Sequence, residues 1–233
     1  MSELNDLLIG CGISTVVGAA IDFSAMFLVS SDWQTVIMGS PRWSWLMGSI
    51  AQFFVFPTLL FLELYSTPLP IEAWLSSPMK EATVWRYVWY YTIWGYWAKD
   101  FVTGQIPKLV FLHHVACLSV LGCTLTEVLE ATSGYLCLGA TLLEVGSLAN
   151  SLMMQCPSSV LINEASAVVM ALSNIASEAL LLWWAFHGNV TTTGEIAGRV
   201  TVCLIGTVLM TVRQLEMIGT IKKARLRWHE KGA

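Results

Sequence analysis

The sequence predicts an all-α protein, a polytopic membrane bundle of about seven transmembrane helices. Hydrophobic residues make up 55% of the 233 residues and charged residues 12%, whereas a soluble domain carries about 25% charged residues. Apolar runs of roughly 20 residues, the length that crosses a bilayer as a helix, recur along the chain. Seven such runs with short connections use up the chain, so we expect no separate soluble domain.

Turn and charge signals between the apolar runs give the approximate bounds of the expected helices. In chain order the helices are Leu7 to Val29, Trp45 to Leu64, Ala82 to Ala98, Pro107 to Leu125, Ser133 to Met153, Glu164 to His187 and Ile196 to Ile218. Backbone polar groups cannot be left unpaired in hydrocarbon, so each run should be helical. Most prolines fall between the runs, but Pro57 lies inside the second run and predicts a kink there.

The first and third runs need separate comment. The first follows MSELND, which lacks the basic flank of a signal peptide, so we interpret it as a retained span. The third is rich in aromatic residues, which favours packing and interfacial anchoring, or alternatively a wall that contacts lipid or sterol. These residues are Trp85, Tyr87, Trp89, Tyr90, Tyr91, Trp94, Tyr96 and Trp97.

The distribution of lysine and arginine predicts the orientation in the membrane. The tail after residue 221 contains Lys222, Lys223, Arg225, Arg227 and Lys231, so the positive-inside rule places the C-terminus in the cytosol. With seven spans the N-terminus is lumenal, and a glycosylation sequon at Asn189 would face the lumen. The chain then divides into an N-terminal span with a cytosolic loop (1–41), a six-helix membrane domain (42–221) and a basic cytosolic tail (222–233).

Several ionisable residues lie inside or beside the apolar runs, where a charge costs about 2.5 to 3.5 kcal/mol on insertion scales. Each should therefore face the bundle interior and have a partner. The predicted orientation gathers most of them into one layer near the cytosolic side, with His113 and His114 roughly 8 Å below the start of their helix. The layer holds Asp22, Asp100, His113, His114, a stripe on one face of the fifth run (Glu144, Ser147, Asn150 and Ser151), and Arg213, Gln214 and Glu216.

A carboxylate beside an imidazole fixes the tautomer of the ring and raises its basicity, as in a general base or a histidine nucleophile. A site open to the cytosolic leaflet could admit an acyl chain from the lipid while a polar head stays in water. Acyl transfer to an amine or a hydroxyl is the natural hypothesis. The alternative is that His113, Asp100 and Glu144 form an interhelical hydrogen-bond network without chemistry.

Three segments carry a resemblance to a known family. Tyr96 with Asp100, Leu112-His113-His114, and Glu144-Val-Gly-Ser147-Leu-Ala-Asn150 resemble the TLC-domain family, which includes the ceramide synthases. The similarity covers roughly Arg42 to Ile221. It implies an endomembrane protein concerned with lipid, in which His113 and His114 are the catalytic or ligand-contacting pair and Asp100, Glu144 and Asn150 support them. The segment VACLSVLGCTLTEV lacks the further acidic residues of ceramide synthases, so the chain looks more like the smaller family members linked to membrane lipid composition.

The resulting hypothesis is an acyl-CoA-dependent lipid acyltransferase of the endoplasmic reticulum or another endomembrane. Its catalytic residues would be His113, His114, Asp100 and Glu144, and its substrate-binding residues Tyr96, Ser147, Asn150 and Arg213. We expect acyl-CoA as co-substrate, membrane lipid or an acyl chain as partner, and no tightly bound cofactor and no nucleic-acid partner. The six cysteines have no metal-ligand spacing, so no metal site is expected. The sequence leaves the oligomeric state open.

Other functions stay as alternatives to acyl transfer. A non-enzymatic lipid-binding protein that regulates membrane lipid composition is the main one, and a transporter is a minor one. A fatty-acid elongase would need a third box histidine and a later helical histidine, which this chain lacks. A retinal-binding protein would need a lysine midway along its last span, and no lysine lies between Ile196 and Ile218.

Overall fold

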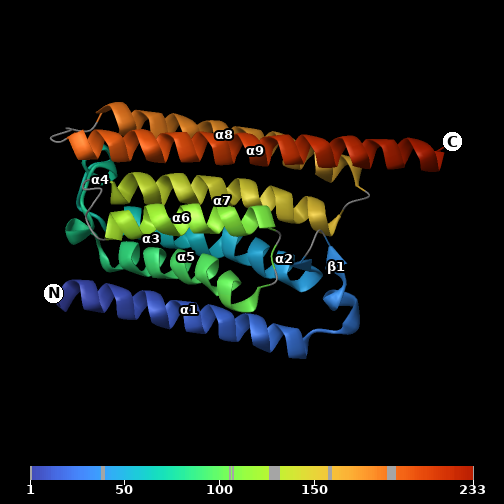
Figure 1. The fold of residues 1–233 in the computed structure, drawn as a ribbon, viewed down its shortest axis with the longest axis horizontal. Helices are drawn as coiled ribbons and strands as arrows, with labels where there is room; N and C mark the ends of the chain where they lie inside the picture. Colours follow the sequence, from blue (N-terminus) through green and yellow to red (C-terminus); the bar gives the residue numbers. More distant parts are fainter. Residues whose placement is uncertain are drawn as a thin grey trace.

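A computed structural model of the chain describes residues 2–37, 40–104, 106, 108–125, 132–156, 159–187 and 193–232. Long helices lie side by side along one common direction, with the N- and C-termini at opposite ends (Figure 1). They are α1 (Ser2–Leu28), α2 (Arg42–Ile50), η2 (Ala51–Val55), α3 (Phe56–Ser66), α5 (Val84–Thr103), α6 (Lys108–Leu125), α7 (Ser133–Gln155), α8 (Val160–His187) and α9 (Thr193–Gly232). The predicted helix start at Pro107 and the sequon at Asn189 lie outside the described residues.

Short elements connect the long helices at their ends. Between α1 and α2 lie η1 (Ser31–Gln34), β1 (Val36–Ile37) and β2 (Ser40–Pro41), and between α3 and α5 lie α4 (Ile71–Leu75) and η3 (Met79–Glu81). The two strands pair antiparallel, with Val36 opposite Pro41.

The structure confirms the all-α class. Within the described residues, five segments are long and apolar enough to cross a membrane, as expected of a multi-pass membrane protein. They are Asn5–Leu28, Arg42–Ser66, Ser133–Gln155, Val160–Phe186 and Ile196–Gly219. The other two predicted runs form α5 and α6. The apolar part of α6, Val110–Leu125, is shorter than these five segments. The count of seven spans therefore stays a prediction.

Two helices continue well past their predicted C-terminal ends. The third predicted run ends at Ala98, but α5 continues to Thr103, so Asp100 lies inside the helix. Gly104 ends α5 with φ of 64°, and its N–H donates to Asp100 O at 3.0 Å. Glycine adopts this left-handed cap without steric cost. The last helix does not stop near Ile218, because α9 continues through the basic residues to Gly232 and extends beyond the other helices (Figure 1).

The helix geometry changes just before Pro57, where the sequence predicts a kink. Ala51–Val55 is a π-helix, and Pro57 follows in the first turn of α3. Proline lacks an N–H and its ring crowds the preceding turn, so the regular α-helical hydrogen-bond pattern cannot continue. A π-helical turn absorbs this change and is often found at functional sites. The side chain of Gln52, in this turn, is buried.

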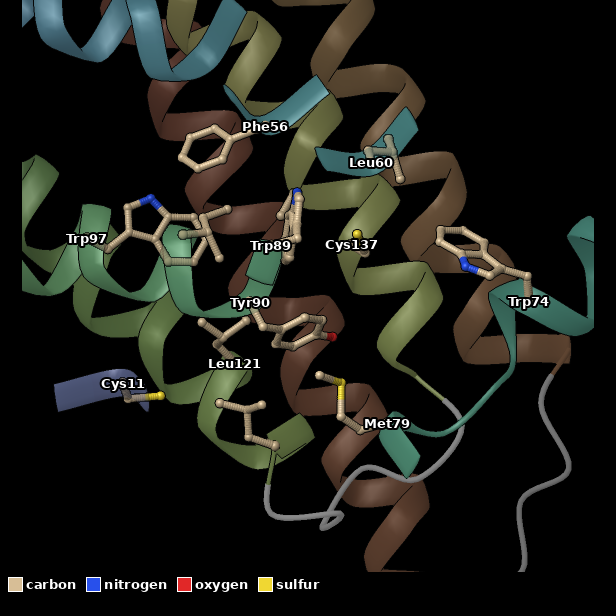
Figure 2. Packing of buried hydrophobic residues seen from close by; sticks show 13 residues of the cluster. Cys11, Phe56, Leu60, Trp74, Met79, Trp89, Tyr90, Trp97, Leu121 and Cys137 are labelled. Carbon is tan, nitrogen blue, oxygen red and sulfur yellow. The ribbon is translucent and has the colours of Figure 1, made fainter. Parts of the chain in front are cut away.

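The hydrophobic core is built around α5. Trp89, Tyr90 and Ile93 are fully buried there. They belong to one cluster with Phe56 of α3 and Leu121 of α6 (Figure 2). Large aromatic side chains dominate core energetics through the area they remove from solvent or lipid. Packing inside the bundle thus accounts for these aromatic residues of the third predicted run.

The first helix packs mainly against α5. Gly10, Ser14 and Gly18 recur every fourth residue of α1 and lie on this contact. A Cβ atom added to Gly95 of α5 would lie 2.5 Å from Ser14 O. Small residues at this spacing let two membrane helices approach closely and gain dispersion energy.

We expect Gly95→Ala to weaken the attachment of α1, because the new methyl group overlaps the backbone of Ser14. The free energy of unfolding should fall by about 1–3 kcal/mol, as for other overpacked sites. Thermal unfolding of the purified protein in detergent measures this loss. Gly12→Ala is the matched control, since nothing lies within 4 Å of a Cβ at that position. Equal stability of the two variants would contradict the close approach.

A buried ion pair lies at the end of the bundle away from Asp100, outside the predicted polar layer. Arg86 Nε donates to Glu63 Oε1 at 2.8 Å, and both side chains are 0% exposed. Arg86 Nη1 donates to Ser77 Oγ at 2.7 Å and to Ser133 Oγ at 2.6 Å. Trp74 Nε1 donates to Glu63 Oε1 at 2.9 Å. The pair therefore joins α3, the following connection, α5 and α7, which indicates a structural role.

Arg86→Met should be strongly destabilising, because it leaves Glu63 buried without its cation. We expect a loss of about 3–5 kcal/mol, and the double variant Glu63→Gln/Arg86→Met should recover a large part of it. Unfolding of the purified variants in detergent measures both effects. Arg225→Gln, which breaks an exposed pair with Glu164, is the control and should change stability little. If the double variant were no more stable than Arg86→Met, the unpaired charge of Glu63 would not be the cause of the loss.

Candidate functional site

A polar cavity of about 160 Å³ lies between α2, η2, α5, α6, α7 and α9. Every residue that the sequence predicts for the site lines this cavity. These residues are Tyr96, Asp100, His113, His114, Glu144, Ser147, Asn150 and Arg213. The stripe on the fifth predicted run therefore faces the same space as the histidine pair.

A chain of buried charged groups forms one side of the polar cavity. Lys99 Nζ lies 2.7 Å from Asp22 Oδ2 and 2.9 Å from Asp100 Oδ1. The other oxygen of Asp100, Oδ2, lies 3.0 Å from His114 Nδ1. Asp22, Asp100 and His114 are all buried. This chain ties α1, α5 and α6 together and gives each carboxylate a cationic or imidazole neighbour.

The two histidines have different surroundings. The sequence hypothesis gave both histidines a catalytic role, and the structure places the carboxylate of Asp100 against His114. The ring nitrogens of His113 lie 3.5 and 3.7 Å from Cys117 Sγ, and its ring centroid lies 6.5 Å from that of Trp97. Consecutive residues of a helix point about 100° apart, so only one of the pair can face Asp100.

The carboxylate of Glu144 is held by neutral donors rather than by a histidine. Gln52 Nε2 donates to Glu144 Oε2 at 2.8 Å, and Trp97 Nε1 donates to Glu144 Oε1 at 3.3 Å. Gln52 Nε2 also donates to Tyr96 Oη at 3.1 Å, and Gln52 Oε1 accepts from Ser151 Oγ at 3.4 Å. Gln52 thus connects η2 with α5 and α7.

Sequence reasoning missed Gln52 as a site residue, although it had a usable signal. Gln52 is an uncharged polar residue within the apolar run SIAQFFVFP, one helical turn before Pro57. Polar side chains inside membrane spans face the interior for the same reason as ionisable ones. Trp97 was recognised only as one aromatic residue among several. Its indole N–H to Glu144 depends on the placement of α7, which composition does not reveal.

An apolar cavity of about 140 Å³ lies beside the polar one, between α6, α7, α8 and α9. Its walls are mainly aliphatic and aromatic. They include Ala116, Val120, Leu136, Leu180 and Trp184. Along α6 the cavity extends from His113 to Thr124, a rise of about 16 Å. Four residues line both cavities, and we call this shared boundary the junction. They are His113, Glu144, Leu209 and Arg213.

The position of Arg213 depends on close contact between α7 and its neighbours. Arg213 Nη2 donates to Leu143 O at 2.9 Å. A Cβ atom added to Gly146 would lie 2.8 Å from Arg213 Nη2 and 2.6 Å from Ser173 Oγ. Only glycine leaves room at this point for both side chains.

Polar residues on the outer helices bond between helices. Asn174 Nδ2 of α8 donates to Gln214 Oε1 of α9 at 2.9 Å, and Thr207 Oγ1 of α9 donates to Glu178 Oε1 of α8 at 2.6 Å. Asn174 and Glu178 thus each join α8 to α9. Such bonds hold membrane helices together and need no catalytic explanation.

Gly146→Ala should displace Arg213 and Ser173, because the added methyl group has no free space. We expect the free energy of unfolding to fall by about 1–3 kcal/mol. The measurement is thermal unfolding in detergent. Gly139→Ala, on the same helix, is the control, since its Cβ would make an ordinary 3.5 Å contact with Leu180. If Gly146→Ala were as stable as the control, Arg213 would not be packed as described.

Comparisons with known proteins give no match for this chain among family models, curated proteins or solved structures. The resemblance to the TLC-domain family therefore stays a prediction. The structure contributes the geometry of a buried centre. In it, imidazole, carboxylate and guanidinium groups lie where a polar cavity joins an apolar one.

Proposed function

We propose that this protein binds an amphiphilic acyl compound across the two cavities and transfers its acyl group to an amine or hydroxyl. The observation that carries the proposal is the junction of the cavities at His113, Glu144 and Arg213. An acyl chain would occupy the apolar cavity, where burial is favourable by about 0.8 kcal/mol per methylene relative to water. The polar end would then lie among Asp100, His114 and the junction residues.

The pair of His114 and Asp100 supports the acyl-transfer step of this proposal. A carboxylate at Nδ1 favours the tautomer whose Nε2 is free to accept a proton. With acyl-CoA as co-substrate, the acceptor nitrogen or oxygen attacks the thioester carbonyl and the carbon–sulfur bond breaks. His114 takes the acceptor proton and returns it to the departing CoA thiolate. His113, at the junction, would contact the carbonyl group that reacts.

We further propose that the chain is a TLC-domain protein of the endoplasmic reticulum or another endomembrane. Support comes from the polar residues of the three resembling segments, which line one cavity: Tyr96, Asp100, His113, His114, Glu144, Ser147 and Asn150. The proposed orientation has seven spans, a lumenal N-terminus and a cytosolic C-terminus. The polar cavity includes Glu216, six residues before the basic Lys222, so it would open toward the cytosolic side.

Lipid binding without turnover is the second candidate function. It is favoured by the neutral hydrogen bonds to Glu144. A carboxylate held in this way can stabilise the bundle and shape a lipid site without taking part in a reaction. The cavities themselves would serve either function.

Incorporation of labelled palmitoyl-CoA into lipid by the purified protein tests the proposal. We expect His114→Ala and Asp100→Asn to lower turnover by roughly 10²–10⁴-fold, the usual contribution of a general base. His113→Ala should also lower turnover, because that ring lies at the junction. Asp32→Asn, an exposed aspartate of η1, is the matched control and should keep wild-type turnover.

Each outcome of this assay separates the two candidate functions. Wild-type turnover in His114→Ala would exclude the proposed base. Bound palmitoyl lipid without any product, in wild type and variants alike, would favour lipid binding without turnover. Native mass spectrometry of the purified protein detects such bound lipid.

A further inference from the structure

We infer that the ligand carries an anionic group at the cavity junction, a carboxylate or a phosphate ester, and that Arg213 binds it. This inference rests on the proposed occupation of both cavities by an amphiphile. In lipid binding without turnover the anionic group belongs to the bound lipid, and in acyl transfer it belongs to the lipid acceptor, because the thioester carbonyl of acyl-CoA is neutral.

The lysine of the polar cavity, Lys99, already has carboxylate partners in the protein. Lys99 Nζ contacts Asp22 and Asp100 at 2.7 and 2.9 Å. Asp100 also faces His114 with its second oxygen. Lys99 therefore has two carboxylate partners within the protein and is not free to bind an anionic ligand.

Glu144 is the carboxylate at the junction. Each of its oxygens accepts a hydrogen bond, one from Gln52 and one from Trp97. Both donors are neutral, and in the described part of the chain no direct ion pair joins Glu144 and Arg213, although their opposite charges attract each other across the junction. The hydrogen bonds that hold Glu144 therefore leave the N–H groups of Arg213 unused.

Arg213 has more hydrogen-bond donors than the protein uses. A guanidinium group has five N–H donors in a planar fork. In the described part of the chain, Arg213 donates one hydrogen bond, from Nη2 to Leu143 O. This acceptor is a neutral carbonyl. Most of the donor capacity of Arg213 is therefore available where the two cavities meet.

The planar arrangement and positive charge of the unused Arg213 donors favour an anionic ligand. The guanidinium fork matches two oxygens of a carboxylate or phosphate, and charge-assisted bonds of this kind are stronger than neutral ones. A ligand ammonium group would be repelled by Arg213 and would meet carboxylates whose oxygens already have donors. An alcohol would supply a single oxygen without charge. His113 lines the same junction and offers a second donor to an anionic oxygen.

Binding of three amphiphiles with the same chain length tests this inference. The probes are hexadecanoate, hexadecyl phosphate and hexadecanol, titrated against the purified protein in phosphatidylcholine nanodiscs and followed by tryptophan fluorescence. We expect at least one anion to bind wild type about tenfold more tightly than the alcohol, the scale of a charged hydrogen bond. A preference for hexadecanoate assigns a carboxylate ligand, and a preference for hexadecyl phosphate assigns a phosphate ester.

Variants of Arg213 then locate the preference. Arg213→Gln should remove it, Arg213→Lys should keep part of it, and Arg225→Gln, on the same helix but exposed, should keep all of it. Equal binding of the alcohol and both anions to wild type would overturn the inference, and that comparison needs no variant to fold. An undiminished preference in Arg213→Gln would overturn it as well. If none of the three compounds binds, the proposed function fails together with the inference.

Discussion

The bundle depends on the rule that a charge removed from water must find a partner inside the protein. Asp100 shows the rule most directly, because one oxygen lies 2.9 Å from Lys99 and the other 3.0 Å from His114. Removing Lys99 would leave Asp22 and Asp100 buried without a lysine partner, which is far more costly than the pair is favourable. Together with the contact between Lys99 and Asp22, these contacts join α1, α5 and α6.

Two arginines inside the bundle, the fully buried Arg86 and the partly buried Arg213, illustrate how the same rule separates structure from function. Arg86 bonds to Glu63, Ser77 and Ser133, and its pair is wholly enclosed. Arg213 donates a single hydrogen bond to a backbone carbonyl at the junction of two cavities. A guanidinium with all its partners in the protein stabilises the fold, whereas one with spare donors beside a cavity is available to a ligand.

The depth of the candidate-site residues along their helices could be predicted from the chain alone. The directions in which their side chains point could not. Depth along each helix follows from residue number, so the layer of Asp100, His113 and Glu144 could be located without a structure. Which imidazole meets the aspartate could not, because it depends on the rotation of α6 about its axis. The inward direction of Gln52 could have been predicted from its polarity within an apolar run, but its contact with Glu144 could not, because that contact joins η2 to α7.

The sequence by itself determined the class of the protein, because apolar runs of membrane length must form helices in hydrocarbon. It also determined which side chains could not face lipid, since their desolvation is costly wherever the helices lie. Only the tertiary structure decided how those side chains pair, that Glu63 and Arg86 form a second buried centre, and that an apolar cavity opens beside Arg213. These features arise between helices, where packing and rotation act, and no single run of residues encodes them.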